Sequence, residues 1–176
     1  MKNITLVQPY NPEWPSWFER MKAFLEPTLT GVPYRMEHVG STAVPGMTAK
    51  PIIDILIIVG RPVFPLVKDR LTTLGYLHQG DLGITDREAF DLADQVTKGS
   101  LPYHHLYVAI EGTTAPREQL CFRNFLRAHP EWVERLSQHK VRLCELYDND
   151  RQSYINGKSA MVREITALAL EHSDLP

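Results

Sequence analysis

Residues 38–59 read HVGSTAVPGMTAKPIIDILIIV and hold a single carboxylate, Asp54, inside an otherwise apolar run over residues 52–59. β-branched and bulky residues fill that run, which predicts a central strand covered on both faces. Side chains alternate along a strand, so Leu56 shares a face with Asp54. Because an unpartnered buried carboxylate is costly or is forced to be neutral, we expect Asp54 near the open end of its strand, beside a cation, a hydrogen-bond donor or a metal.

The segment before this strand ends in a turn that suits an anion. Residues 34–39 predict another strand, which Gly40, Ser41 and Thr42 break with a flexible glycine followed by two hydroxyls. Such a turn can aim backbone N–H groups and the Ser41 hydroxyl at a phosphate. The three residues are therefore candidates for phosphate binding.

A glycine–serine turn followed by an aspartate on the next strand resembles the signature of the nucleotidyltransferase superfamily. Four segments together also resemble the GrpB-like family of small bacterial proteins. They are HVGSTAVPGMTAKPIIDILI (38–57), HHLYV (104–108), FRNFLRAHPE (122–131) and KSAMVREI (158–165). The resemblance covers nearly the whole chain and implies a nucleotidyltransferase-like fold. In some bacteria a domain of this type follows a dephospho-coenzyme A kinase.

One departure from the superfamily bears on activity. The resemblance implies a second carboxylate two residues after Asp54, and Leu56 occupies that position. Mg²⁺ usually takes one or two carboxylates together with phosphate oxygens and waters, so we expect Mg²⁺ on Asp54 with an incomplete set of acids. The candidates for a further acid are Asp81, Asp86, Glu88 and Asp91.

The composition limits the class of protein. The length of 176 residues suits a single domain, with residues 1–112 as a mixed α/β core and residues 113–176 as a helical tail packed on it. A net charge of −2 without a basic run argues against nucleic acid and leaves a small anionic or nucleotide ligand as the expected partner.

The cysteines and the hydrophobic segments bear on where the protein is located. The two cysteines, Cys121 and Cys144, do not follow a disulfide or metal-binding spacing, so we expect both to be reduced thiols. No segment resembles a signal peptide or a membrane span, so we expect a cytoplasmic protein without a membrane partner. Nothing in the sequence selects an oligomeric state.

Local patterns predict an α+β fold, a nucleotidyltransferase-like mixed sheet with flanking helices and a C-terminal helical tail. The predicted strands cover residues 4–8, 34–39, 52–59, 76–79, 89–93 and 103–110. The predicted helices cover residues 14–29 and 61–75, and three more begin near Pro116, Pro130 and the cluster at residues 148–150.

Two lysines of the tail lie on helix faces that are otherwise apolar, Lys140 and Lys158. A lysine in such a place usually packs its methylene stem and releases its ammonium to water, and we expect this of either lysine taken alone. Since there are two, we hypothesise that Lys158 points toward the Asp54 end of the sheet and meets a phosphate or a carboxylate.

Strand alternation separates two histidines in the strand predicted over residues 103–110. His104 falls on an apolar face and predicts a core residue, whereas His105 shares the other face with Tyr107 and is the candidate catalytic group. A structural hydrogen bond is the alternative for His105, as it is for His38 before the turn. The resemblance implies a His-Leu-His pattern here, and Tyr107 replaces the second histidine, which argues against a two-histidine metal site.

Three further basic residues come into question for phosphate contact. Arg123 lies in the matched segment 122–131, and a guanidinium suits bidentate contact with phosphate. For Arg127, one helical turn later, an exposed ion pair of little energetic value is the alternative. Lys50, four residues before Asp54, is expected to be the nearest counter-ion of that carboxylate.

Two functions remain after the common templates are excluded. The chain has no Walker phosphate loop, Rossmann glycine pattern, zinc-protease helix or serine-hydrolase elbow. The first function is a Mg²⁺-assisted transfer of a nucleotidyl group, with Asp54 on the metal, Gly40 and Ser41 on the phosphates and Lys158 as a charge clamp. The second is a binding module for a nucleotide, a coenzyme A-like molecule or another anionic metabolite, which Leu56 favours. An accessory interaction protein is a third alternative.

Overall fold

The computed structural model describes residues 4–173, and the chain divides into two compact units. The sheet unit comprises residues 13–39 and 52–117, and the helical unit comprises residues 4–12, 40–51 and 118–173. The glycine–serine turn therefore belongs to the helical unit, and Asp54 belongs to the sheet unit. The expected packing of a helical tail on a mixed core stays a prediction.

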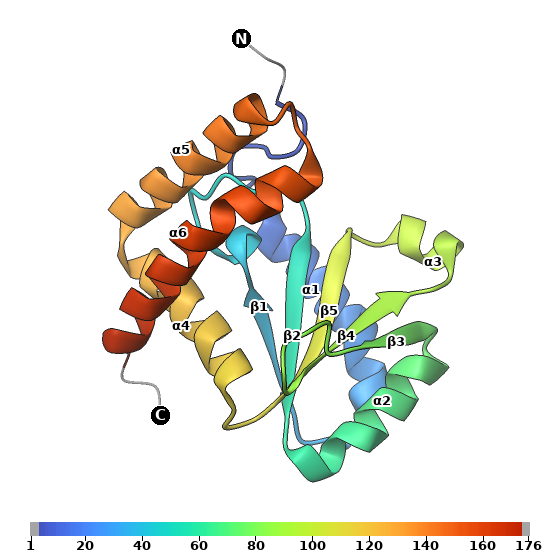
Figure 1. The fold of residues 1–176 in the computed structure, drawn as a ribbon. Coiled ribbons are helices and arrows are strands. Elements are labelled where there is room, and N and C mark those ends of the chain that lie inside the picture. The colour runs from blue at the N-terminus through green and yellow to red at the C-terminus, as the bar shows by residue number, and fades with distance from the viewer. Residues whose placement is uncertain (1–3, 174–176) are drawn as a thin grey trace. The chain divides into compact units, whose positions relative to one another are not determined.

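Five strands form a mixed sheet in the order β1-β2-β5-β4-β3 (Figure 1). They are β1 (Arg35–Val39), β2 (Ile53–Val59), β5 (His104–Ile110), β4 (Arg87–Leu92) and β3 (Tyr76–Gly80). β2 runs parallel to β5, and the other neighbouring pairs are antiparallel. Every residue of β2 except Asp54 is buried, as expected of a central strand. These observations confirm the α+β fold and five of the six predicted strands.

Two helices, α1 (Trp14–Leu25) and α2 (Phe64–Thr73), cover one face of the sheet. Phe18 of α1 stacks on His38 with ring centroids 5.0 Å apart, and Phe64 of α2 meets His78 edge-on at 6.3 Å. Both histidines belong to one row of cross-strand neighbours, which continues through Ile55, Leu106 and Phe90. His38 is thus a packing residue, and the opposite face carries Asp54. Short 3₁₀ turns, Glu26–Leu29 and Arg61–Val63, follow α1 and precede α2.

The helical unit is built mainly from α4 (Thr114–Ala128), α5 (Pro130–Leu146) and α6 (Arg151–Glu171), of which α4 begins in the sheet unit. α5 and α6 pack side by side (Figure 1). The predicted cap of α6 is confirmed, since the Asp150 carboxylate accepts the Ser153 N–H at 2.7 Å. In residues 4–173 no helix has both the length and the apolar character needed to cross a membrane.

The strand predicted over residues 4–8 is wrong. Only Gln8 forms an isolated β-bridge. The N–H groups of Thr5 and Leu6 donate instead to Oδ1 of Asn149, at 3.0 and 3.3 Å. An amide side chain thus takes the place of a neighbouring strand, so the apolar residues of this segment pack without joining a sheet.

One helix was not predicted, α3 (Gln95–Ser100). Its N-terminus is capped by Asp94, which accepts the Thr97 N–H at 2.8 Å. A helix of six residues is too short to show an apolar period, so a cap is its only signal in the sequence.

Candidate functional site

Asp54 and His105 form a hydrogen-bonded pair in the sheet unit. The two residues are direct partners in the register of β2 and β5, and Nδ1 of His105 lies 2.9 Å from Oδ1 of Asp54. The Asp54 side chain is 28% exposed and the His105 side chain is 34% exposed, so both can be reached from solvent. The partner expected for Asp54 is therefore a hydrogen-bond donor, His105.

The carboxylate of Asp54 sets the tautomer of the His105 ring. An ionised carboxylate only accepts hydrogen bonds, so Nδ1 carries the proton and Nε2 of the neutral ring is an acceptor. Tyr103 and Tyr107 meet the ring edge-on, each with centroids 6.2 Å away. Burial and the Asp54 charge raise the pKa of Tyr107, so its phenol stays protonated. The pair can accept a proton or a hydrogen bond from a ligand at Nε2.

His104, the preceding residue, has a structural role on the opposite face. Its buried ring donates from Nδ1 to the Pro102 carbonyl and accepts at Nε2 from the Tyr76 hydroxyl, both at 2.8 Å. Burial lowers the pKa of His104 and raises the pKa of Tyr76, so both groups stay neutral. The predicted core position of His104 is confirmed.

The glycine–serine turn lies in the helical unit, where a buried lysine holds it. Gly40 has a φ of 72°, which favours glycine, and Ser41–Ala43 form a 3₁₀ turn, η2. The ammonium of Lys140 donates to Oγ of Ser41 at 2.8 Å and to the carbonyl oxygen of Thr48 at 2.9 Å. Because Oγ of Ser41 accepts from Lys140, its own hydrogen needs another acceptor, and residues 4–173 provide none. The Ser41 hydroxyl is therefore a donor available to a ligand.

Lys140 of α5 contacts this turn, and the sequence analysis did not assign it to a site. Its side chain is 1% exposed, so the expected release of its ammonium to water is wrong for this lysine. The physical reason is that segment 40–51 supplies two acceptors to the ammonium, Oγ of Ser41 and the carbonyl oxygen of Thr48. The available signal was its place on an otherwise apolar face of α5.

Lys50 and Lys158 meet at the ring of Tyr154 in the helical unit. Each ammonium lies 5.5 Å from the ring centroid. Tyr154 is buried, and this burial raises the pKa of its hydroxyl. A neutral aromatic face attracts cations, so the ring holds both lysines in place. Two candidate phosphate ligands are brought together here, and their contact with phosphate stays a prediction.

The two arginines of α4 make different contacts. Nε of Arg123 donates to Oδ1 of Asn124 at 3.0 Å, and the side chain is 9% exposed. Nε of Arg127 donates to the carbonyl oxygen of Ala43 at 2.9 Å. Arg127 therefore supports the backbone of η2, whereas phosphate binding by Arg123 stays a prediction.

The acids considered as further metal ligands all have local partners. Asp81, Asp86, Glu88 and Asp91 pair with Gly83, Arg61, His78 and Lys98, in that order, at 2.6 to 2.8 Å. Within residues 4–173, no three or more His, Cys, Asp or Glu residues are grouped to hold a metal ion. The register instead places Glu37 opposite Leu56, on the face that carries Asp54. The described residues thus offer no cluster of protein ligands for a metal, and Mg²⁺ on Asp54 stays a prediction.

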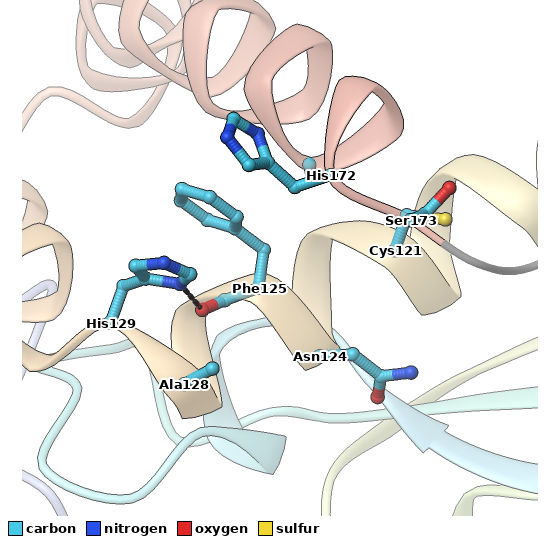
Figure 2. Close-up of a pocket in the computed structure, with 8 residues that line it drawn as sticks. Cys121, Asn124, Phe125, Ala128, His129, His172 and Ser173 are labelled. Carbon is cyan, nitrogen blue, oxygen red and sulfur yellow. Dashed lines mark hydrogen bonds between the residues drawn. The ribbon is translucent and has the colours of Figure 1, made fainter.

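A pocket of about 200 Å³ opens in the helical unit between α4 and the end of α6 (Figure 2). The ring of His129 stacks on Phe125 with centroids 4.0 Å apart, and the ring of His172 lies 6.2 Å from Phe125. The pocket is lined by Cys121, Asn124, Phe125, Ala128, His129, Ala169, His172 and Ser173. None of the predicted site residues is among them, so the pocket does not support the phosphate hypothesis.

Comparison with known sequences gives a match to the family model "GrpB protein" over residues 4–168. UPF0157 protein BH1888 of Halalkalibacterium halodurans is 34% identical over 163 residues, which are 93% of this chain and 80% of that protein. Glutamate-rich protein GrpB of Alkalihalophilus pseudofirmus is 32% identical over 170 residues, which are 93% of this chain and 95% of that protein. The chain spans only 44% of the length of another relative, UPF0157 protein YqkA of Bacillus subtilis.

Two solved structures have a fold similar to that of this chain. The crystal structure of the conserved protein GrpB from Enterococcus faecalis is similar with a TM-score of 0.80 and 29% identity, over 94% of this chain and 97% of that chain. The Cid1 poly(U) polymerase with MgGTP bound is similar with a TM-score of 0.54 and 10% identity, over 77% of this chain and 44% of that chain. The second likeness concerns the fold alone and confirms that it is nucleotidyltransferase-like. By sequence and by structure, this chain belongs to the GrpB family.

Proposed function

We propose that this protein binds a nucleotide or a similar phosphate-bearing ligand through the glycine–serine turn. The observation that carries the proposal is the buried ammonium of Lys140, 2.8 Å from Oγ of Ser41. Burying an ammonium is costly unless polar groups compensate it, and Lys140 spends part of that compensation on the Ser41 hydroxyl. A serine hydroxyl backed by a fixed positive charge is suited to donate to a phosphate oxygen.

Two further lysines lie in the same unit. Lys50 and Lys158 are both half-buried and share the ring of Tyr154, which limits their freedom before a ligand arrives. Preorganised cations lose less conformational entropy on binding than mobile ones. In this proposal they contact additional phosphate groups, so a di- or triphosphate binds more tightly than a monophosphate.

The likeness to Cid1 supports a nucleotide as the ligand, because that polymerase has the same type of fold and is described with MgGTP bound. At 10% identity this support extends to the class of ligand only. The base and the sugar are therefore left open in the proposal, and the phosphate groups are its defining element.

Transfer of the nucleotidyl group is a second candidate, which the Asp54–His105 pair favours. A Mg²⁺ carried by a nucleotide would supply Lewis acidity, and Asp54 would be the carboxylate of the sheet unit that holds it. His105 would hold the hydroxyl of an acceptor at Nε2. Because Leu56 takes the second acid position and is fully buried, binding without turnover is the function that we favour.

Titration calorimetry with nucleoside triphosphates and coenzyme A precursors, with and without Mg²⁺, tests the binding proposal. We expect K140M and S41A to weaken triphosphate binding at least about tenfold, since each removes a charge or a donor worth roughly 1.5 kcal/mol. The matched control is K68M, which removes a lysine charge from α2 and should bind as the wild type does. Equal affinity in K140M, S41A and wild type, or no binding by the wild type, would overturn the proposal.

The same samples separate binding from transfer. Release of pyrophosphate by the wild type and its loss in D54N would establish transfer, whereas tight binding without release would establish the binding module. A carboxylate introduced at Leu56 is a poorer test, because this side chain is 0% exposed and a buried carboxylate would destabilise the strand.

A further inference from the structure

Arg87, the first residue of β4, has an arrangement that folding alone does not explain. Its guanidinium carbon lies 4.2 Å from the centroid of the Tyr107 ring. Nε of Arg87 is buried without a hydrogen-bond partner, and no ion pair joins Arg87 to another residue of 4–173. A buried donor left without an acceptor destabilises the folded protein. The nearby Arg61, by contrast, pairs with Asp86 at 2.7 Å.

The sheet register places Arg87 on the face that carries the Asp54–His105 pair. Arg87 is opposite Ala109, and Tyr107 and His105 follow on the same face at alternate positions of β5. The Arg87 side chain covers Tyr107 rather than Ala109, so it leans along β5 toward His105. Tyr107 in turn meets the His105 ring edge-on at 6.2 Å.

The groups on this face are complementary to one kind of ligand. A guanidinium stacked on an aromatic ring has a fixed plane, and its two terminal nitrogens can bind a phosphate or a carboxylate side by side. Beyond the same tyrosine ring, the neutral form of His105 that donates from Nδ1 to Asp54 presents Nε2 as an acceptor. Asp54 and His105 are accessible to solvent at 28% and 34% of their side chains.

We infer that Arg87 anchors an oxyanion subsite of the sheet unit, which takes a small molecule with a phosphate or carboxylate group and a hydroxyl that donates to Nε2 of His105. The subsite extends beyond the proposed nucleotide binding, since neither Ser41 nor Lys140 takes part in it. Tyr107 holds the plane of the guanidinium, and the oxyanion accepts from its two terminal nitrogens.

NMR titration of the ¹⁵N-labelled protein tests the subsite through the Nε–Hε signal of Arg87, which R87M identifies by its loss. The probes are inorganic phosphate, malonate and hydroxymalonate, so a phosphate is distinguished from a carboxylate. We expect at least one oxyanion to shift this signal in the wild type. The affinities of the wild type and all variants are followed through the backbone amide signals of β5, and R87M and R87K should each weaken binding at least about tenfold, because methionine and lysine lack the planar fork. The matched control is R135M, since Arg135 also stacks on an aromatic ring, 4.0 Å from the centroid of Trp132, and its loss should leave the affinity unchanged.

The histidine arm uses the pair of probes that differ by one hydroxyl. Hydroxymalonate should bind the wild type more tightly than malonate, and H105F should abolish this preference. The inference is overturned if no probe shifts the Arg87 signal, if R87M or R87K binds like the wild type, or if H105F keeps the preference. These results do not depend on K140M, so failure of the subsite and failure of nucleotide binding are distinguishable.

Discussion

His104 links the stability of the protein to pH at the scale of a single residue. Burial lowers the pKa of His104 in the folded state, so the unfolded chain, in which an imidazole titrates near about 6.5, binds the proton more readily. The stability contributed by the neutral ring is therefore complete above about pH 6.5 and is lost as the pH falls below that value. The loss from this one group is at most about 1.4 kcal/mol per pH unit.

Replacing His104 by Gln removes this titration. Urea unfolding between about pH 5 and about pH 7.5 should show a shallower fall of the unfolding free energy in H104Q than in the wild type. Lost hydrogen bonds to Tyr76 and Pro102 lower the stability of H104Q at every pH, so the slope is the relevant quantity. H172Q, a change at an exposed histidine, serves as the control with the wild-type slope. Parallel curves for H104Q and wild type would contradict the assignment.

Residues of the candidate site differ in how far the sequence reveals them. Strand alternation is a local rule, so it separated His105 from His104 and marked Asp54 as an anomaly. Their hydrogen bond also required β2 and β5 to be neighbours, although 51 positions separate the two residues. Lys140 and Arg87 were not assigned to sites, because each acquires its role through a distant residue, and Lys140 lies 99 positions from Ser41.

Gly157 sets the distance between two elements, α5 and α6. A Cβ on Gly157 would lie 2.5 Å from Cδ2 of Leu143 and 3.4 Å from Cε2 of Tyr147. Replacing glycine by alanine inside an exposed helix usually stabilises it by about 1 kcal/mol. Because Leu143 is itself buried and cannot move freely, we expect G157A instead to destabilise the protein by about 1–3 kcal/mol.

Urea unfolding of G157A beside G99A measures this effect. Gly99 lies in α3, and a Cβ there would meet nothing within 4 Å, so G99A should stabilise by roughly 0.5–1 kcal/mol. The loss of unfolding free energy in the double variant L143A/G157A should be smaller than the sum of the losses in the two single variants, since the side chain of Leu143 is the group with which the new Cβ clashes. A G157A protein as stable as G99A would show that α5 and α6 do not approach so closely.

The elements themselves were largely predictable, for reasons that also explain the exceptions. The run over 52–59 and the helix periods of α4, α5 and α6 are long enough to show their pattern, and proline or aspartate marks their beginnings. Residues 4–8 show the strand composition but bind the side chain of Asn149, a partner that no local pattern reveals. The helix predicted over residues 14–29 ends at Leu25 in the structure, because the segment with Pro27 continues as a 3₁₀ turn.

At the scale of the whole chain, the helical unit is assembled from three separate segments. Residues 40–51 follow β1 and precede β2, yet belong with α5 and α6. Val44 and Met47, both 0% exposed, share a core cluster with Leu136. A division of the sequence near residue 112 does not anticipate this arrangement, because a short irregular segment has no periodicity to indicate which core it joins.

Replacing Met47 by Ala tests whether this segment and the helices form one cooperative unit. Met47 lies in the core of the helical unit, and its truncation should cost about 2–5 kcal/mol. Native-state hydrogen exchange should then show reduced protection in residues 40–51 and in α5 and α6 together. I57A, a matched core deletion in β2, should instead reduce protection in β2 and in its neighbours β1 and β5. Loss confined to residues 40–51 in M47A would mean that this segment is joined to α5 by hydrogen bonds without a shared cooperative core, and the proposed phosphate site would then lack a rigid support.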